Sequence, residues 1–545
     1  MSRAELIERL SSREPFDLLV VGGGATGLGT ALEAASRGYR VALVDAHDFA
    51  KGTSSRATKL VHGGVRYLAQ GDVALVREAL HERRLLLQNA PHLARPLGFV
   101  MPSYRLWERP FYGLGLLAYD LLAGRAGLGR TRWLGSGLTR ELLPGVQPHG
   151  LRGGVLYWDG QFDDARLAIA LARTAEQHGA CVANYCAVTR LLHEGGRVTG
   201  AECEDAETRQ RFEVRASAVV NATGVWVDQL RRLDDEGAGR APAPMVSPSQ
   251  GVHLVLDREF LPSLHALLVP RTADGRVLFA VPWMGKVILG TTDTPRADIA
   301  LEPRPFAEEV AFLLDESARY LARAPRREDV RSSWVGLRPL VAEPSSREGG
   351  ATKGLSRSHT VVVSHQKLVT VTGGKWTTYR AMGEDVVVTC VREGLLKPPA
   401  HGESPTRRLP LVGAPAQATA TNAEGADTHL TEPASLRLYG TEASLVHALP
   451  GAERNLLDDC TSVPESRRSA AGLLTEAMVR FAVRHEHARC VEDVLARRSR
   501  LLFLDATFAA AAAPAVAAIV REETGRDPGL DEFLALCGQY GQLPP

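Results

Sequence analysis

The stretch FDLLVVGGGATGLGTALEAASRGYRVALVD, residues 16–45, decides the fold class. Residues 16–21 form an almost wholly apolar run, which is typical of a parallel strand buried on both faces. Three glycines follow at once, and residues 30–37 then predict a helix that Gly38 ends. Residues 39–44 predict a second strand. The stretch therefore predicts a strand–helix–strand unit at the start of an α/β domain.

The glycines between strand and helix have the spacing G-x-G-x-x-G, at Gly22, Gly24 and Gly27. The first two allow a tight turn and a close approach of backbone amides to a pyrophosphate, and the third lets the helix pack on the strand. Asp45 lies 18 residues beyond Gly27, where a carboxylate accepts the hydrogen bonds of a ribose diol. The pattern predicts a dinucleotide site, but it does not choose between FAD and NAD.

Composition narrows the classes of protein to consider. A chain of 545 residues is too long for one compact core, so we expect two or three domains. Lys and Arg number 64 against 63 Asp and Glu, which gives no reason to expect a nucleic-acid partner. The seven cysteines never have the spacing of a metal pair or a redox motif, which favours a reducing compartment and no disulfide framework. We also expect no bound metal. We expect neither a secretory signal nor a spanning segment, because no apolar run approaches about 20 residues.

The order of predicted elements suggests three regions. Residues 16–395 mix strands and helices, as expected of a nucleotide-binding domain interleaved with a mainly antiparallel substrate domain. The further strands are expected at 219–220, 252–256, 276–281, 286–289 and 360–363, and the further helices at 73–89, 164–178 and 306–324. Residues 396–434 are rich in proline and small polar residues and indicate a linker. Residues 435–545 predict a helical C-terminal domain, with a helical period throughout 469–500.

Several separated segments match one known pattern. They are GTSSRATKLVHGGVRYL (52–68), FDDARL (162–167), NATGVWVDQL (221–230), VPWMGKVILGTTDT (281–294), VGLRPL (335–340) and TGGKWTTYR (372–380). With the N-terminal glycines, they resemble the FAD-dependent glycerol-3-phosphate dehydrogenases of the glutathione-reductase-like, D-amino-acid-oxidase-type flavoprotein group. The resemblance runs from about residue 16 to residue 380. It implies an α/β fold in which a Rossmann-like FAD-binding domain is interleaved with an antiparallel β substrate domain.

The resemblance also implies which residues line the FAD. Small and hydroxyl residues can donate to phosphate or flavin oxygens and leave room for a planar ring. The implied cofactor residues, besides Gly22, Gly24, Gly27 and Asp45, are Thr53, Ser54, Ser55, His62, Gly63, Gly64, Ala222, Gly224, Gly373, Gly374 and Lys375.

A phosphorylated polyol needs cations for its phosphate and a group that accepts the hydroxyl proton. The resemblance nominates Arg66, Tyr67, His253, Arg338, Arg357 and Lys375 for these tasks. His253 is the preferred base because imidazole titrates near neutral pH, and His62 is the alternative. Arg338 would stabilise the developing alkoxide in either case. Trp376 departs from the pattern, since the family commonly carries a smaller aliphatic residue after this lysine.

The implied reaction takes a hydride from the C2 alcohol of sn-glycerol 3-phosphate and passes the electrons to a membrane quinone. A quinone is confined to the bilayer, so we expect a peripheral contact on the cytoplasmic face of the inner membrane. Residues 107–133 are the best candidate, because apolar and aromatic residues there are flanked by arginines. The alternative is a helix packed inside the substrate domain.

Three other functions stay open. An oxidase of the same group would return the electrons to oxygen, and an amine-oxidising relative would take a zwitterionic substrate. A flavin-binding interaction module without catalysis is the third. A homodimer is compatible with the sequence, which contains nothing that specifies the oligomeric state.

Overall fold

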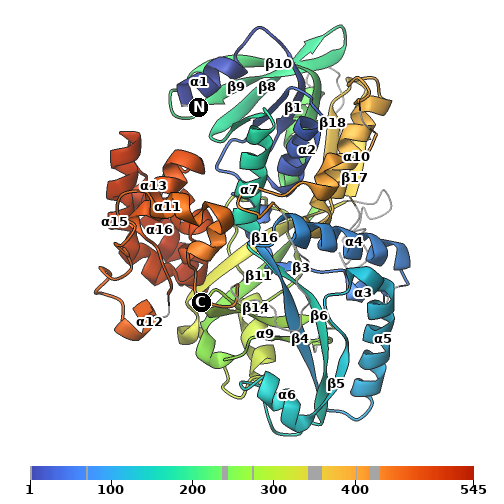
Figure 1. The fold of residues 1–545 in the computed structure, drawn as a ribbon, viewed down its shortest axis with the longest axis vertical. Coiled ribbons are helices and arrows are strands. Elements are labelled where there is room, and N and C mark those ends of the chain that lie inside the picture. Colours follow the sequence, from blue (N-terminus) through green and yellow to red (C-terminus); the bar gives the residue numbers. More distant parts are fainter. Residues whose placement is uncertain are drawn as a thin grey trace.

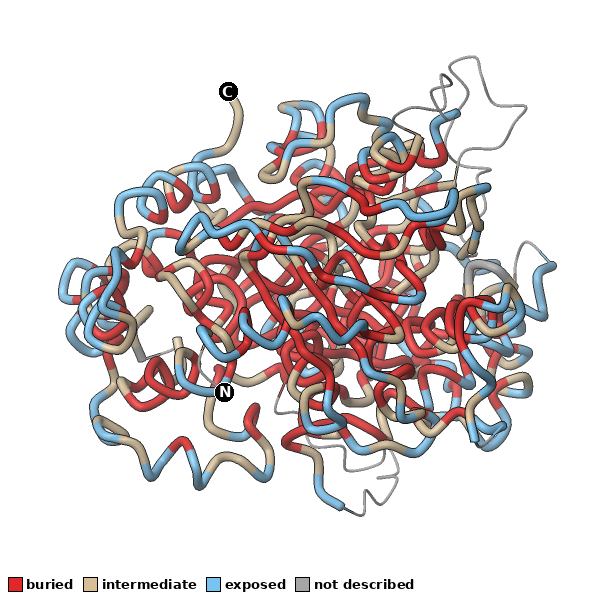
Figure 2. The backbone as a smooth tube through the Cα atoms, turned by 90° about the horizontal axis from the view of Figure 1, so that it is seen from above, coloured by how far each residue is buried: buried red, intermediate tan, exposed pale blue. Residues whose placement is uncertain are grey.

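The computed structural model describes residues 3–68, 71–235, 243–272, 275–341, 359–400, 402–416, 430–469 and 471–545. Two large sheets lie one above the other, and a group of C-terminal helices stands beside them (Figure 1). Buried residues fill the centre of the molecule (Figure 2). Each predicted strand or helix overlaps an observed element of the same kind.

The first sheet forms around the glycine-rich stretch. Its strand order is β17-β18-β10-β1-β2-β7, and the hairpin of β8 and β9 extends it through β10. β1 pairs in parallel with both β2 and β10, so the carboxyl ends of these strands meet at one edge. The strands are β1 Phe16–Val21, β2 Val41–Val44, β7 Cys181–Ala183, β8 Cys186–Glu194, β9 Arg197–Asp205, β10 Arg211–Asn221, β17 His359–Val363 and β18 Val369–Gly373. This edge is where ligands bind in α/β sheets of this type.

Helix α2, Ala25–Ser36, begins five residues before the predicted start at residue 30. Two of its glycines explain why it reaches back into the fingerprint. A Cβ at Gly27 would lie 1.8 Å from the carbonyl oxygen of Gly22, and one at Gly29 would lie 2.9 Å from Tyr379. These glycines therefore serve close packing inside the helix, where composition alone suggested a loop. Helices α7 Asp164–Gln177 and α10 Tyr379–Arg392 contact α2.

The second sheet is mainly antiparallel. Its order is β15-β11-β14-β13-β12-β4-β6-β3, with β16 paired to β11 and β5 to β6. The strands are β3 Leu60–Val61, β4 Ala94–Ser103, β5 Arg132–Gly135, β6 Gly153–Phe162, β11 Val246–Asp257, β12 Ala266–Val269, β13 Leu278–Trp283, β14 Lys286–Gly290, β15 Thr294–Pro295 and β16 Ser332–Val341. The remaining helices before the C-terminal group are α1 Arg3–Leu10, α3 Val65–Leu68, α4 Val73–Asn89, α5 Glu108–Ala123, α6 Ser136–Leu142, α8 Val227–Asp234 and α9 Ala307–Ala318. The two sheets confirm the predicted fold class.

The C-terminal group contains α11 Ala443–His447, α12 Glu465–Ser469, α13 Glu476–His485, α14 Leu501–Leu504, α15 Ala506–Thr524 and α16 Leu530–Gly541. The expected continuous helical period over 469–500 is wrong. Helix α13 ends at His485, His487 is left-handed, and a π-helix follows at Asp493–Arg498. Buried ion pairs of this segment, described below, outweigh its local helix propensity.

The C-terminal helices share a core with the second sheet. Trp334 and Phe503 belong to one buried cluster, and their ring centroids are 5.2 Å apart. The division at residues 396–434 stays a prediction, and residue 401 and residues 417–429 of that segment lie outside the described ones. Within the described ranges, the helices are too short or too polar to traverse a bilayer.

Candidate functional site

A cavity of about 1190 Å³ lies between the two sheets. Its lining comes from the glycine-rich turn after β1 and from strands β11 and β16. Residues 52–54, residues 56–58 and helix α5 also contribute to it. The cavity therefore joins the predicted dinucleotide site, the predicted substrate residues and the predicted membrane segment.

The turn after β1 presents bare backbone to the cavity. Gly22 has φ +111°, and a Cβ there would lie 2.6 Å from the carbonyl oxygen of Ala222. A Cβ at Gly24 would lie 3.0 Å from the hydroxyl of Ser54, which accepts a hydrogen bond from the amide of Ala25 at 2.9 Å. The N-terminus of α2 supplies partial positive charge at the same place. A pyrophosphate fits this cradle, and side chains on these glycines would close it.

Asp45 stands at the end of β2, as predicted, and lines the cavity. Its carboxylate accepts hydrogen bonds from the amides of Gly23 at 2.5 Å and His47 at 2.8 Å. Burial raises the pKa of Asp45 to about 6, although these two amides oppose the shift. A carboxylate held in this way is oriented to accept the hydroxyls of a ribose.

The structure places most of the predicted cofactor residues on the cavity wall. Those that line it are Gly22, Gly24, Asp45, Thr53, Ser54, His62, Gly64, Ala222, Gly224, Gly373, Gly374 and Lys375. Gly27, Ser55 and Gly63 are not part of the lining. Gly27 packs on Gly22, and Gly63 faces Leu80 and Tyr119, where a Cβ would lie 2.4 and 2.2 Å from side-chain atoms.

Trp376 is part of the cavity lining, and its side chain is held by neighbours on the wall. Its indole nitrogen donates to the carbonyl of Ser54 at 2.8 Å, and its ring packs edge-on against Phe162 and Tyr379. The side chain is 9% exposed. The larger residue at this position therefore buttresses the loop that carries Thr53 and Ser54.

The predicted base, His253, lies in the middle of β11 and lines the cavity. It is 3% exposed, and burial lowers its pKa well below the ordinary value, with further contributions from the cations of Lys59 and Arg338. The ring is therefore neutral at physiological pH, and the same surroundings make it a weaker proton acceptor than a free imidazole.

Arg338 lies on β16, four residues beyond Trp334, the residue opposite His253, and it also lines the cavity. Its guanidinium contacts Asp293 and the carbonyl of Gln250, each at 3.1 Å, and Thr291 Oγ1 at 3.1 Å. These contacts orient a charge that is still 24% exposed. Lys375 is half-buried and lines the same cavity.

The other nominated substrate residues are not described. The side chains of Arg66 and Tyr67, in α3, and all of Arg357 lie outside the described residues. Their roles stay predictions.

The sequence analysis did not single out Lys59, which is fully buried. Its ammonium donates to the carbonyl of Ser55 at 2.8 Å and to Asp164 at 2.7 Å. Three aromatic rings, those of Trp283, Trp334 and Phe503, each have their centroid 5.3 Å from it. Burial lowers the pKa of Lys59 to about 7. The only sequence signal was its place in the matched segment 52–68.

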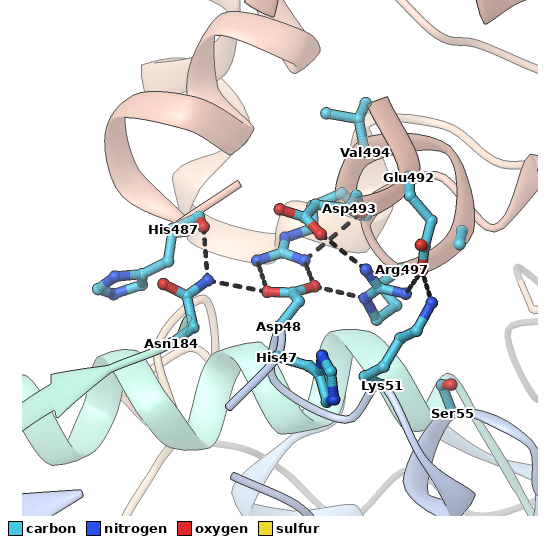
Figure 3. A network of polar contacts seen from close by, with 12 residues as sticks. His47, Asp48, Lys51, Ser55, Asn184, His487, Glu492, Asp493, Val494 and Arg497 are labelled. Atoms are coloured by element: carbon cyan, nitrogen blue, oxygen red, sulfur yellow. Dashed lines mark hydrogen bonds and ion pairs between the residues drawn. The ribbon is translucent and has the colours of Figure 1, made fainter. Parts of the chain in front are cut away.

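Buried charges connect the C-terminal region to residues 48–51, which directly precede the cavity-lining segment with Thr53 and Ser54 (Figure 3). Asp48 is paired with both Arg497 and Arg498, and Asn184 donates to it at 3.1 Å. Lys51 is paired with Glu492. The arginines hold the pKa of Asp48 well below its usual range against the effect of burial, and Arg497 and Lys51 lower that of Glu492 to about 2.

Helix α5 contributes both to the cavity lining and to the molecular surface. Phe111, Leu114 and Leu121 are 65%, 64% and 83% exposed, and the first two also line the cavity. Leu116 and Tyr119, which we expected on the same apolar surface, instead face inward, because Tyr119 donates to the buried Asp159 at 3.0 Å. The helix therefore packs on one face and exposes an apolar stripe on the other.

Two family models match the chain. Residues 17–380 match the model of FAD dependent oxidoreductases. Residues 404–529 match the model described as the C-terminal domain of alpha-glycerophosphate oxidase. Together, the two matches cover both sheets and most of the C-terminal helices.

The chain is also similar to curated proteins along most of its length. It is 40% identical to the mitochondrial glycerol-3-phosphate dehydrogenase of Homo sapiens over 554 residues, which cover 96% of this chain and 73% of that protein. It is 39% identical to a mitochondrial glycerol-3-phosphate dehydrogenase of Arabidopsis thaliana over 535 residues, 94% of this chain and 84% of that protein.

Solved structures share the fold. The glycerol-3-phosphate dehydrogenase from Bacillus halodurans complexed with FAD has a TM-score of 0.75 and 27% identity, and the match covers 99% of this chain and 98% of that one. An L-alpha-glycerophosphate oxidase from Mycoplasma pneumoniae with FAD bound has a TM-score of 0.54, 18% identity and coverage of 69% and 94%. With the geometry of the glycine cradle, the family model of FAD dependent oxidoreductases and the FAD complex from Bacillus halodurans confirm that the cofactor is FAD.

Proposed function

Because this chain belongs to the FAD-dependent glycerol-3-phosphate dehydrogenase family, we propose that it oxidises sn-glycerol 3-phosphate to dihydroxyacetone phosphate and delivers the electrons to a membrane quinone. Bound FAD supplies the acceptor for the hydride. The residues of the cavity have the remaining tasks: to bind the dianion, to remove the proton of the C2 hydroxyl, and to keep water out.

The observation that carries this proposal is the pair formed by a neutral imidazole and an oriented guanidinium on one cavity wall. His253 is in the protonation state that a general base requires, because burial and two nearby cations disfavour its imidazolium. Arg338 is held by Asp293 with part of its charge still accessible. A hydroxyl placed between the two side chains would lose its proton to the first while the second stabilises the oxygen.

The phosphate requires additional cations. Arg338 and Lys375 line the same cavity, and each supplies a positive charge that would attract a dianion. Arg66 and Arg357 are proposed to complete this set. A zwitterionic amino acid would find these cations poorly matched to its ammonium group, which favours the phosphorylated polyol over the amine-oxidising alternative.

The quinone part of the proposal is supported by the position of α5. Phe111 and Leu114 both line the cavity and are exposed, so this helix joins the cofactor cavity to the outside. The arginines near it are Arg105, Arg109, Arg125, Arg130 and Arg132. An exposed apolar stripe bordered by arginines suits a headgroup boundary with anionic lipid, and we propose that it rests on the cytoplasmic face of the membrane.

One set of assays tests the whole proposal. The FAD-loaded protein is given glycerol 3-phosphate, glycerol or a D-amino acid, each with a soluble dye, with oxygen, or with quinone in vesicles. Of the three substrates, we expect only glycerol 3-phosphate to be oxidised. We expect its oxidation to be much faster with dye or quinone as the acceptor than with oxygen. Peroxide formed at the rate of dye reduction would instead identify an oxidase, and turnover of the amino acid would exclude the proposed substrate.

A further inference from the structure

The hydroxyl of Ser54 caps helix α2 from another part of the chain. The first amides of a helix have no partner inside the helix, and the side chain at the N-cap position commonly accepts a hydrogen bond from one of them. In α2 that position is Gly24, which has no side chain for this purpose. The amide of Ala25 instead donates to the hydroxyl oxygen of Ser54 at 2.9 Å. Ser54 therefore supplies a cap that Gly24 cannot.

This contact leaves the proton of the Ser54 hydroxyl available to a ligand. A backbone N–H can only donate, so the hydroxyl oxygen is the acceptor and its own proton points elsewhere. Ser54 is half-buried and lines the cavity. A Cβ at Gly24 would lie 3.0 Å from this hydroxyl oxygen, so the hydroxyl lies directly beside the bare backbone of the cradle. It can therefore donate to an anion bound at the N-terminus of α2.

The backbone of Ser54 is fixed through its carbonyl by Trp376. Ser54 and Ser55 lie in one turn of 3-10 helix. The carbonyl of Ser55 accepts from Lys59 and from Arg500, both at 2.8 Å. The carbonyl of Ser54 accepts from the indole nitrogen of Trp376, also at 2.8 Å. Both carbonyls of the turn are thus held by side chains, and Trp376 provides the contact at Ser54 itself.

The indole of Trp376 is packed into the same unit as the capped helix. Its ring lies edge-on to Phe162 and Tyr379, with centroids 5.6 and 5.9 Å apart. Tyr379 in turn packs on α2, where a Cβ at Gly29 would lie 2.9 Å from it. An aliphatic side chain, which the family commonly carries at this position, has no hydrogen to donate. The contact with the carbonyl of Ser54 therefore depends on the tryptophan of this chain.

We propose that Trp376 is a positioning residue for FAD. Its indole N–H holds the carbonyl of Ser54 so that the Ser54 hydroxyl, which already accepts from Ala25, donates to a phosphate oxygen of the FAD pyrophosphate. The hydroxyl and the N-terminus of α2 then stabilise the same negative charge. The inference concerns the retention of FAD and is independent of the substrate and of the electron acceptor.

A role of Trp376 in packing alone predicts a different pattern. If the ring only fills space, its loss weakens FAD binding whether or not the Ser54 hydroxyl is present, and the effects of two variants multiply. If Trp376 acts through Ser54, its effect disappears once that hydroxyl has been removed. A double-mutant cycle of Trp376→Phe and Ser54→Ala separates the two cases, because phenylalanine keeps a ring and removes the N–H.

The test measures how fast FAD leaves the FAD-loaded protein after dilution, by flavin fluorescence. Hydrogen bonds to charged groups are stronger than those between neutral groups, so we expect release to be about 10- to 100-fold faster in Ser54→Ala and about 3- to 10-fold faster in Trp376→Phe. The double variant should release FAD no faster than Ser54→Ala. Trp158→Phe, at a half-buried tryptophan outside the cavity lining, is the matched control and should retain FAD like the parent.

Phosphorus NMR of the same FAD-loaded proteins reports on the pyrophosphate directly. We expect Ser54→Ala and Trp376→Phe to shift the same phosphorus signal of bound FAD, and Trp158→Phe to shift neither signal. Trp376→Leu, with the kind of side chain that is common in the family, replaces Trp376→Phe if the latter does not fold.

Three results would overturn the inference. Release of FAD at the parent rate from Trp376→Phe would exclude a role of the indole in holding the cofactor. Effects that multiply in the double variant would reduce Trp376 to a packing residue. Phosphorus signals that are unchanged in Ser54→Ala would show that this hydroxyl does not contact the phosphate.

Discussion

Arg500, near the end of the chain, donates through Nη2 to the backbone carbonyl of Ser55 over 2.8 Å. The same guanidinium nitrogen contacts Asp164 at 3.0 Å, and the side chain is fully buried. Ser55 follows Thr53 and Ser54, which line the cofactor cavity. A residue of the C-terminal region therefore supports the segment that carries Thr53 and Ser54, from outside the cavity lining.

Replacing Arg500 with Met should loosen that loop. The change leaves a buried carboxylate pair, Asp163 and Asp164, with less positive charge, and breaking a buried ion pair typically costs about 3 to 5 kcal/mol of unfolding free energy. We expect a lower Tm and faster FAD loss on dilution, measured by flavin fluorescence. Arg521→Met, on an exposed face of α15, is the control. Unchanged FAD retention in Arg500→Met would exclude the clamp.

Arg338 is proposed to bind the phosphate and to stabilise the alkoxide of the substrate. Its replacement should therefore slow the reaction without loss of FAD. Arg338→Ala should cost about 2 to 5 kcal/mol of transition-state stabilisation, because it removes a charged hydrogen-bond partner from a half-buried site. We expect a lower kcat/KM for glycerol 3-phosphate at full flavin content. Arg319→Ala, on the surface of α9's C-terminus, should behave as the parent. Parent rates in Arg338→Ala would remove this residue from the substrate site.

The charge network in Figure 3 predicts how the stability of the fold changes with pH. The folded-state pKa of Glu492 is lowered from 4.5 to about 2, so the folded protein binds fewer protons than the unfolded chain between these values. This contribution is present above the unfolded pKa and is lost as pH falls from about 4.5 to about 2.

The measurement is Tm against pH for the parent and for Glu492→Gln. We expect the parent to be more stable at pH 7 and the gap to close below about pH 4.5. Glu78→Gln, an exposed carboxylate on α4, should show no such gap. A gap that persists at low pH would show that Glu492 stabilises the fold by packing alone.

The exposed stripe of α5 predicts a contact with anionic membranes. Leu121 is 83% exposed and is not part of the cavity lining, so Leu121→Glu tests the surface without disturbing the site. We expect this variant to sediment less with anionic vesicles and to lose quinone reduction more than dye reduction. Leu445→Glu, at a leucine that is 57% exposed on α11, is the matched control. If Leu121→Glu and the parent sediment equally with the vesicles, the proposed membrane contact of α5 is wrong.

The sequence by itself determined the local parts of this protein. The apolar run of β1, the glycines at 22, 24 and 27, and Asp45 predicted a dinucleotide site, because a tight turn, a helix N-terminus and a strand end depend on neighbours along the chain. The segments that carry the family resemblance predicted His253 and Arg338 as substrate residues. In the structure, both side chains line one cavity. Each of these predictions depends only on the spacing of nearby residues or on the order of motifs along the chain.

Only the tertiary structure decided the contacts that cross the chain. Arg500 and Ser55 are 445 positions apart, and no periodicity indicates that one holds the other. The cage of Lys59 is assembled from β13, β16 and α14, and the exposed face of α5 depends on what packs behind Tyr119. A buried charge or an apolar stripe has the same sequence signature whether it lies inside or outside, because burial is a property of the packed chain and its partners.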